Sequence, residues 1–378
     1  MLTKKREGFR YLYSNGEAGI VGDENVKVCQ LSSVEVADGT LLQARDITVT
    51  NTHFIVDNVK LVGQLIEPED ASSKTTLIVY AHGSEERGWI EQSPDPYQMV
   101  ARGLSVFVYD KRGTGLSEGN YTQNFPQLAK DLTAASAEAK RLAQGRFGRF
   151  GLFGLSQGGW IAPLAAEQSQ ADFIVIGYGL VVDIREEDAA QVELELLQSG
   201  FGADVIAKAK RVTDVTGRIA ASGYTQGLDE MEALRQEFAE EAWFAAIKGG
   251  FSGVILGMSS QELRENGIPM FDRLDIDWSL KPVDVLRKVK VPQLWVLAGE
   301  DREAPIEKTI QRLKMLRAEG LPIEIQLFPA TDHGMWEFHE RDDGSRQYTK
   351  VTEGYHDLMA DWAKDGCFSK VHGSSIEY

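Results

Sequence analysis

Cysteine is scarce in this sequence, with Cys29 and Cys367 as the two cysteines among 378 residues. Two cysteines are too few for a disulfide framework or a thiolate metal cluster. A single disulfide between Cys29 and Cys367 stays an open alternative. Long apolar runs are also lacking, because no stretch approaches the roughly 20 residues that a membrane-spanning helix needs. The basic start at residues 1–6 is followed by polar residues rather than by an apolar segment. We therefore expect no signal peptide and no membrane partner, which slightly favours a cytoplasmic protein.

Positive charge is in short supply, with 40 Lys and Arg against 57 Asp and Glu and a formal net charge of −17 at pH 7. Binding to nucleic acid or to an anionic membrane surface depends on clustered basic side chains. The charge balance therefore argues against both kinds of partner. An apolar fraction of 43% fits a globular protein with a substantial core, and the charge balance is typical of an acidic enzyme with a solvated surface. Nothing in the sequence indicates the oligomeric state.

Signatures of metal and nucleotide cofactors are missing as well. The sequence contains no H-E-x-x-H pattern and no paired Cys/His spacing, so we expect no metal site. The glycine-rich segment 109–119 (YDKRGTGLSEG) lacks the third glycine of a dinucleotide-binding loop, because Glu118 occupies that position. We interpret the segment as a tight loop held by polar contacts of Asp110 and Arg112. The predicted site therefore needs no cofactor.

Buried strands alternate with helices through much of the chain. Nearly continuous apolar runs, typical of strands covered on both faces, lie at 75–81, 105–109, 150–153, 173–177 and 292–298. Amphipathic helical patterns lie between or beside them at 92–102, 126–143, 158–168 and 306–319. This alternation predicts an α/β fold with a mostly parallel central sheet and helices on both faces. We expect 323–328 nearer an edge, and an antiparallel pair formed by 41–50 and 59–66.

The alternation is interrupted between residues 181 and 282. This stretch is charged and contains helical patterns at 186–198, 203–221 and 229–248. Since core strands resume at residue 292, we expect a helical cap, 181–282, inserted into a core made of 41–180 and 283–378. Residues 1–40 are expected to be an N-terminal extension, and a separate domain is the alternative to the cap. Aromatic residues of this stretch pack its own core or line a substrate pocket: Phe201, Trp243, Phe244, Phe251 and Trp278.

The pentapeptide GLSQG at residues 154–158 lies between a buried strand and a helix. A nucleophile elbow needs this context, because its serine occupies a tight strand-to-helix turn that requires close approach of the backbone. The nearby helix N-terminus also favours developing negative charge. We therefore predict that Ser156 is a catalytic nucleophile rather than part of a structural turn.

A serine nucleophile needs a base and an orienting acid, and two later strand ends supply both. The run 292–298 leads to Asp301, the candidate acid, and the run 323–328 leads to His333, the candidate base. Both residues follow carboxyl ends of strands, where an open α/β sheet assembles its site. The alternatives for the acid are Glu300, Glu303 and Asp183.

The oxyanion of an acyl-transfer intermediate needs two backbone N–H groups. We assign them to Gln157, which follows the nucleophile, and to Ser84, in the loop after the first buried strand. His82 belongs to the same loop but is interpreted as a structural hydrogen-bonding residue. Asp332, beside the candidate base, is interpreted as a loop anchor.

Taken in order, these motifs resemble α/β-hydrolase-fold serine esterases. The motifs are HGS at 82–84, D-x-R-G-x-G-x-S at 110–117, G-x-S-x-G-G at 154–159, GED at 299–301 and DHG at 332–334. The chain is most similar to serine aminopeptidase-like and dienelactone-hydrolase-like bacterial carboxylesterases over residues 60–365, apart from the cap. The resemblance implies Ser156 as nucleophile, Asp301 as acid and His333 as base, with oxyanion N–H groups from Ser84 and Gln157. One departure is EERG at 85–88, where related esterases often carry another glycine directly after this motif.

The sequence therefore predicts a serine hydrolase that cleaves small-molecule carboxylic esters by two-step acyl transfer. An aminopeptidase or amidase of the same fold is the first alternative, and it requires carboxylates near Ser156 to bind a free amino terminus. Residues 186–188 (EED) could serve, although a solvated acidic face is the simpler interpretation. The second alternative is a binding protein on the same scaffold that performs no catalysis.

Overall fold

The computed structural model describes residues 46–267 and 274–378 in full, together with the backbone of six short strands among the first 45 residues. These strands form two antiparallel sheets, β1-β2-β3 and β4-β5-β6. Their bounds are Thr3–Lys5, Gly8–Leu12, Ala18–Val21, Val26–Cys29, Ser33–Val36 and Leu41–Gln43. The remainder of the expected N-terminal extension, residues 1–40, lies outside the described residues.

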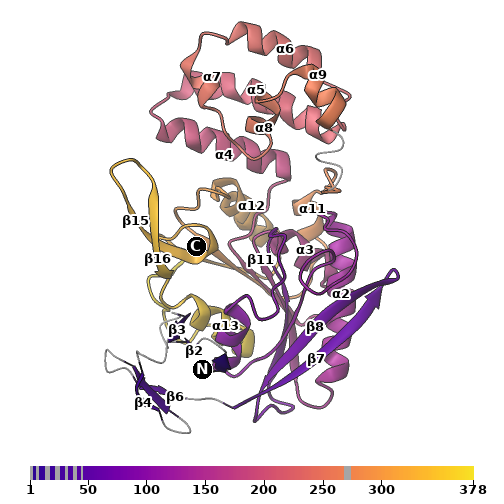
Figure 1. The fold of residues 1–378 in the computed structure, drawn as a ribbon, viewed down its shortest axis with the longest axis vertical. Coiled ribbons are helices and arrows are strands. Elements are labelled where there is room, and N and C mark those ends of the chain that lie inside the picture. The colour runs from indigo at the N-terminus through magenta and orange to yellow at the C-terminus, as the bar shows by residue number, and fades with distance from the viewer. Residues whose placement is uncertain are drawn as a thin grey trace.

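A nine-stranded sheet forms the centre of the molecule, in the order β17-β14-β13-β12-β11-β9-β10-β8-β7 (Figure 1). All neighbours from β14 to β10 pair in parallel, whereas β17, β8 and β7 pair antiparallel at the two edges. The predicted mostly parallel sheet is therefore confirmed. The bounds of these strands are β7 Ile47–Val56, β8 Val59–Pro68, β9 Thr76–Ala81, β10 Ser105–Tyr109, β11 Arg149–Leu155, β12 Phe173–Gly177, β13 Gln293–Ala298, β14 Ile323–Phe328 and β17 Ile376–Glu377.

The first strand of the antiparallel pair differs from the prediction. It is β7, which spans Ile47–Val56 instead of 41–50 and pairs with β8 along its whole length. The two strands join through Asp57 and Asn58, whose φ angles are 50° and 64°. Positive φ at both central residues is typical of a two-residue hairpin turn, and Asp and Asn tolerate it well. This turn, rather than the apolar alternation, fixes the register of the pair.

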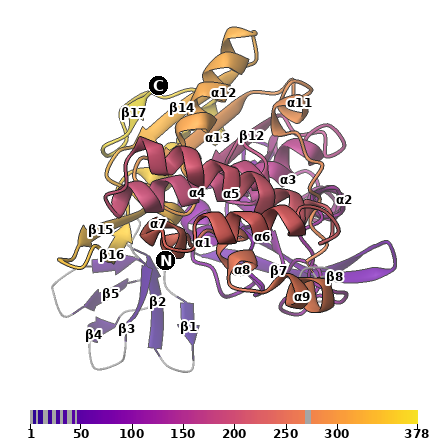
Figure 2. The same cartoon turned by 90° about the horizontal axis from the view of Figure 1, so that it is seen from above.

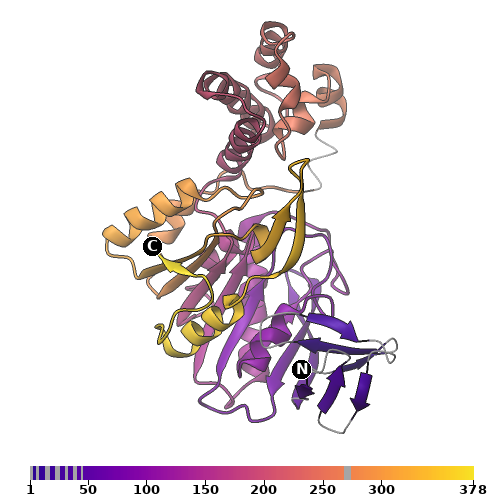
Figure 3. The same cartoon turned by 90° about the vertical axis from the view of Figure 1, so that its left-hand side faces the viewer.

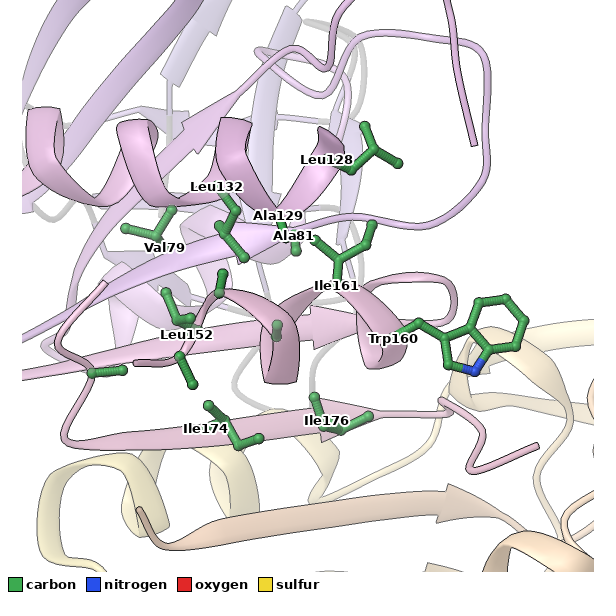
Figure 4. Close-up of a cluster of buried hydrophobic side chains, with 14 of the residues drawn as sticks. Val79, Ala81, Leu128, Ala129, Leu132, Leu152, Trp160, Ile161, Ile174 and Ile176 are labelled. Atoms are coloured by element: carbon green, nitrogen blue, oxygen red, sulfur yellow. The ribbon is translucent and has the colours of Figure 1, made fainter. Parts of the chain in front are cut away.

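Both faces of the inner sheet are buried, which explains the continuous apolar runs. In β9, Leu77 and Val79 belong to one buried cluster, whereas Ile78 and Tyr80 belong to the other, because alternate residues face opposite sides. Helices α2, α3, α11 and α12 cover the first face, and α1 and α13 cover the second. Figure 4 shows the first cluster between the strands and the helices. The helix bounds are α1 Asp95–Ala101, α2 Phe125–Leu142, α3 Gly158–Ala165, α11 Pro282–Leu286, α12 Glu307–Ala318 and α13 Tyr355–Asp365.

The helices between β12 and α11 form a group of their own, which lies above the core in Figure 1 and is seen from above in Figure 2. They pack around an apolar cluster of their own, which includes the buried Trp243. The expected helix at 203–221 matches α5, but the one at 229–248 is two helices, because α6 ends at Glu237 and α7 begins after Glu241. Their bounds are α4 Ile184–Gln198, α5 Ala203–Ala221, α6 Leu228–Glu237, α7 Ala242–Ala246, α8 Ser252–Leu256, α9 Ser260–Glu262 and the π-helical turn η2 Leu263–Gly267.

A β-hairpin that sequence patterning did not indicate follows the last parallel strand. It consists of β15 (Trp336–Glu340) and β16 (Arg346–Val351), which pair antiparallel after the short turn η3 (His333–Met335). Figure 3 shows it projecting from the core toward the helices between β12 and α11. The hairpin therefore stands directly beside the loop that carries the candidate base.

Candidate active site

Ser156 lies in the tight turn between β11 and α3. Its backbone φ is 51°, a left-handed conformation that is strained for a residue with a side chain. The two flanking glycines make the turn feasible. A Cβ on Gly154 would overlap the carbonyl oxygen of Gly158, and a Cβ on Gly158 would overlap that of Ala81 in β9. Sequence and packing together thus present the serine hydroxyl at the carboxyl end of the sheet.

The structure brings Ser156, His333 and Asp301 together in one hydrogen-bonded chain. Nε2 of His333 is 3.1 Å from Oγ of Ser156, and its Nδ1 is 2.9 Å from Oδ2 of Asp301. Asp301 is buried, and its other oxygen accepts hydrogen bonds from the backbone N–H groups of Glu303 and Ala304. A carboxylate held in this way fixes the orientation of the imidazole and stabilises its protonated form.

Charge around His333 raises its affinity for a proton. Burial lowers the pKa of His333, but the hydrogen bond and charge of Asp301, with the charges of Glu303 and Glu187, outweigh it and raise the pKa to about 9. Glu303 contributes directly, because its Oε1 lies 3.7 Å from Nε2. The imidazole is therefore a strong base in the free protein.

Of the other candidate acids, Glu303 lies near Nε2 of His333 rather than near Nδ1, and Glu300 and Asp183 lie elsewhere. Glu300 contacts Arg346, and Asp183 caps the N-terminus of α4 by accepting a hydrogen bond from the backbone N–H of Glu186. Asp332 accepts hydrogen bonds from the backbone N–H groups of Arg302 and His333, and forms a buried ion pair with Arg346 at 2.7 Å. Asp332 thus ties the two loops that carry the acid and the base to the β15–β16 hairpin.

The loop after β9 approaches the serine closely, since a Cβ on Gly83 would lie 3.4 Å from Cβ of Ser156. Two residues that sequence reasoning missed hold this loop. The buried ammonium of Lys111 donates to the carbonyl oxygen of Gly83, and the hydroxyl of Tyr121 donates to that of Ser84. In a trans peptide the C=O and N–H point in opposite directions, so the Gly83 contact aims the N–H of Ser84 away from Lys111.

Gln157, the second expected oxyanion donor, is buried at the N-terminus of α3. Ser84 and Gln157 both line a small cavity that reaches Ser156. Free backbone N–H groups at a helix N-terminus favour a negatively charged oxygen. The structure therefore places both candidate donors around the same space beside the serine hydroxyl.

His82 is buried under the loop, and its ring stacks on Trp89 with centroids 4.9 Å apart. Its Nδ1 lies 3.3 Å from Glu85, and burial, reinforced by Lys111, lowers the pKa of His82 to about 4. The following glycine-rich loop is held by Asp110, whose carboxylate accepts hydrogen bonds from the backbone N–H groups of Trp89, Ile90 and Leu116. Asp110 therefore holds its loop as predicted. His82 instead relies on ring stacking and on its contact with Glu85, because neither of its ring nitrogens has a hydrogen-bond partner among the described residues.

Two cavities open at Ser156. The larger has a volume of about 660 Å³ and extends past His333 to Trp89, Trp336 and Lys350 of the surrounding loops and hairpin. The smaller, of about 100 Å³, extends past Gln157 and Trp160 toward the helices between β12 and α11. Ser156 therefore stands where two spaces of unequal size meet.

The interpretation of residues 186–188 as a solvated face is wrong. Glu186 forms a bidentate ion pair with Arg312, and the buried Asp188 accepts hydrogen bonds from the backbone N–H groups of Phe251 and Ser252. Glu187 lines the smaller cavity, where burial raises its pKa to about 8. Three consecutive residues of a helix point in different directions, which a composition argument cannot resolve.

Within the described residues, no group of three or more His, Cys, Asp and Glu side chains is arranged to hold a metal ion. None of the helices found there has the length and apolar character that crossing a membrane requires.

Comparisons with known proteins identify the family. A model of the alpha/beta hydrolase family matches residues 78–344. No curated protein matches the chain. Similar solved structures include an esterase of Pyrococcus furiosus, with 17% identity, a TM-score of 0.46, and coverage of 76% of this chain and 84% of that one. An acylaminoacyl peptidase of Pyrococcus horikoshii has 14% identity and a TM-score of 0.49, covering 97% and 53%. A proline iminopeptidase of Mycobacterium smegmatis has 16% identity and a TM-score of 0.47, covering 83% and 97%.

The family model spans more than half of the chain, including the strands and loops that carry the candidate site. The predicted α/β-hydrolase fold is thereby confirmed, and the chain belongs to the alpha/beta hydrolase family.

Proposed function

We propose that this alpha/beta hydrolase cleaves carboxylic esters of small molecules through Ser156, as a carboxylesterase-type serine hydrolase. The observation that carries the proposal is the hydrogen-bonded chain from Oγ of Ser156 through His333 to Asp301, at 3.1 Å and 2.9 Å. These distances are those of a nucleophile, a general base and an orienting acid. The motifs around the three residues support a place near the serine aminopeptidase-like and dienelactone-hydrolase-like carboxylesterases.

In the first step His333 takes the proton of Ser156 at Nε2 while Oγ bonds to the ester carbonyl carbon. The N–H groups of Ser84 and Gln157 stabilise the resulting oxyanion. His333 then donates the proton to the alcohol oxygen as the carbon–oxygen bond breaks, and Asp301 stabilises the imidazolium throughout. The acyl group is left as an ester of Ser156.

In the second step water replaces the alcohol. His333 takes a proton from the water, whose oxygen attacks the acyl carbon, and the same N–H groups stabilise the second oxyanion. Collapse of this intermediate returns the proton to Oγ of Ser156 and releases the carboxylic acid. The helices of residues 181–282 act as a cap that limits which acyl groups reach the serine.

The direct test is covalent labelling by a fluorophosphonate, together with hydrolysis of nitrophenyl acetate. We expect labelling and hydrolysis in the natural protein and in Ser199→Ala, which changes an exposed serine at the end of α4. Ser156→Ala should abolish labelling and reduce hydrolysis by at least about a thousandfold. Absence of labelling, or labelling that survives Ser156→Ala, would favour the binding-protein alternative and refute the proposal.

An aminopeptidase is the second candidate, and Glu187 is the observation that favours it. This carboxyl lines the small cavity beside Ser156, with Glu303 on the same cavity wall. An ammonium group entering there would find two carboxyls, and its charge would hold Glu187 in the ionised form. Free aminoacyl nitroanilides should then be cleaved faster than their N-acetylated counterparts, and Glu187→Gln should remove that preference. Equal rates for both would leave the esterase as the better account.

A further inference from the structure

The two cavities at Ser156 differ in volume by more than sixfold, at about 660 Å³ and about 100 Å³. The larger lies in the range of pockets that hold drug-sized ligands. The smaller is below the roughly 150 Å³ of an apolar cavity that binds benzene. That space therefore favours an acyl chain of two to four carbons over one that carries a benzene ring. The size of each half of a substrate is therefore constrained separately.

The chemistry at His333 decides which half of an ester enters which cavity. A general acid must reach the leaving oxygen within hydrogen-bond distance. His333 and the adjacent Gly334 line the larger cavity, and neither lines the smaller one. The alcohol that accepts the proton from Nε2 therefore departs into the larger cavity.

The acyl half then occupies the smaller cavity. Gln157, a candidate oxyanion donor, and Trp160 in the following helix line the smaller cavity and not the larger one. Its lining combines the apolar side chains of Leu180, Ile184 and Phe251 with the carboxyls of Glu187 and Glu303. Phe251 is held in place, because its ring packs edge-on against Trp278 at 5.0 Å and its backbone N–H donates to Asp188. The wall that limits acyl length is thus built on fixed side chains.

We propose that the substrates are esters of a short acyl group, two to four carbons long, with a bulky alcohol that fills the larger cavity. This inference rests on the proposed esterase function and assigns its substrate class. The order of events fits this division. When the bulky alcohol leaves, the larger cavity empties and admits the water that attacks the acyl group held in the smaller one.

A pair of isomeric esters tests the proposal. Benzyl acetate and methyl phenylacetate contain the same atoms, with the ester group reversed, and both release a primary alcohol. We expect kcat/KM for benzyl acetate to exceed that for methyl phenylacetate by at least about tenfold. A single extra methylene in a pocket already lowers kcat/KM by about tenfold or more, and a ring that does not fit should lower it at least as much. Equal values, or a preference for methyl phenylacetate, would overturn the proposal.

Enlarging the smaller cavity should erase the preference. Phe251→Ala removes part of its lining and should raise kcat/KM for methyl phenylacetate relative to that for benzyl acetate by about tenfold. Phe251→Leu, which keeps an apolar contact to Trp278, provides a milder variant if the first one fails to fold. The matched control is Phe244→Ala, because Phe244 packs within the cluster around Trp243 and lines neither cavity. An unchanged ratio in a folded Phe251 variant would contradict the assignment.

Fluorophosphonate labelling distinguishes failure of this substrate assignment from failure of the proposed esterase function. A protein that labels at Ser156 but does not prefer benzyl acetate refutes the division of the cavities and leaves the esterase standing. A protein that neither labels nor hydrolyses either isomer refutes both proposals.

Discussion

His333 is surrounded by negative charge. Burial opposes its protonation, but Asp301, Glu303 and Glu187 together raise its pKa to about 9. Only the neutral imidazole can accept the proton of Ser156. The free protein should therefore be a poor hydrolase at pH 7 and a better one as the pH rises toward 9.

The pH profile of kcat/KM for nitrophenyl acetate checks this, because it reports the pKa of the free enzyme. We expect a rise with an apparent pKa near 9. Glu303→Gln removes a negative charge that favours the imidazolium, so it lowers this pKa and moves the rise to lower pH by about half a unit. Glu307→Gln, at an exposed position at the start of α12, should leave the profile unchanged. A shift to higher pH in Glu303→Gln would contradict the electrostatic assignment.

At the scale of elements, the sequence predicts the parts that obey a simple period or a local motif. The buried strands β9 to β13 appear as apolar runs because both of their faces pack against helices. The loops after β13 and β14 were predictable because parallel strands bring their carboxyl ends to one edge. The roles assigned to Ser156, Asp301 and His333 stay predictions, although their side chains meet in the structure.

Other elements depend on contacts that a single sequence does not display. The β15–β16 hairpin is half exposed, and the ion pair between Arg346 and Asp332 anchors it to the loop after β14, a contact that no periodic sequence pattern indicates. Lys111 is buried because its ammonium meets the carbonyl oxygen of Gly83 across the fold. The direction of Glu187 depends on how α4 turns relative to the core. Each of these is a tertiary effect that overrides composition.

The elbow between β11 and α3 yields a prediction about close backbone approach. A methyl group on Gly158 would overlap the carbonyl oxygen of Ala81, and both groups belong to backbone that cannot move aside cheaply. Gly158→Ala should therefore lower the free energy of unfolding by about 1–3 kcal/mol and reduce esterase activity at least tenfold. Urea denaturation and nitrophenyl acetate hydrolysis measure the two effects.

Gly257→Ala is the control for this substitution, because the nearest atoms to its added methyl group would lie at 3.4 Å and 3.5 Å, ordinary contact distances. Its stability should stay close to that of the natural protein. If Gly158→Ala were equally well tolerated, the close approach of α3 to β9 would be refuted.

The whole molecule carries a formal net charge of −17, and the larger cavity has Glu85, Asp95 and Glu303 in its lining. A field of this sign concentrates cations and repels anions near the site. Its reach is set by salt, since the Debye length falls from about 30 Å at 0.01 M to about 3 Å at 1 M. Association with charged substrates should therefore depend on ionic strength.

Acetate esters of a quaternary ammonium alcohol and of a sulfonate alcohol of similar size measure this effect. At about 0.01 M salt we expect kcat/KM to be at least about tenfold higher for the cationic ester, and this ratio to shrink as salt approaches 1 M. A neutral ester of the same size should respond little. A preference for the anionic ester at low salt would show that local positive groups such as Arg87 and Lys350 dominate the cavity.

The spacing of the site along the chain has a consequence for protein synthesis. Ser156 and His333 are 177 residues apart. Asp301 and His333 follow β13 and β14, which extend the sheet from β12 and are synthesised after the helices between β12 and α11. A growing chain on the ribosome therefore carries its proposed nucleophile long before its proposed base. On the proposed roles, such a chain lacks the base that would activate the serine and should not hydrolyse esters while it is incomplete. The onset of ester hydrolysis should therefore coincide with the addition of β14, the last parallel strand, to the sheet. The appearance of activity would then report the end of folding.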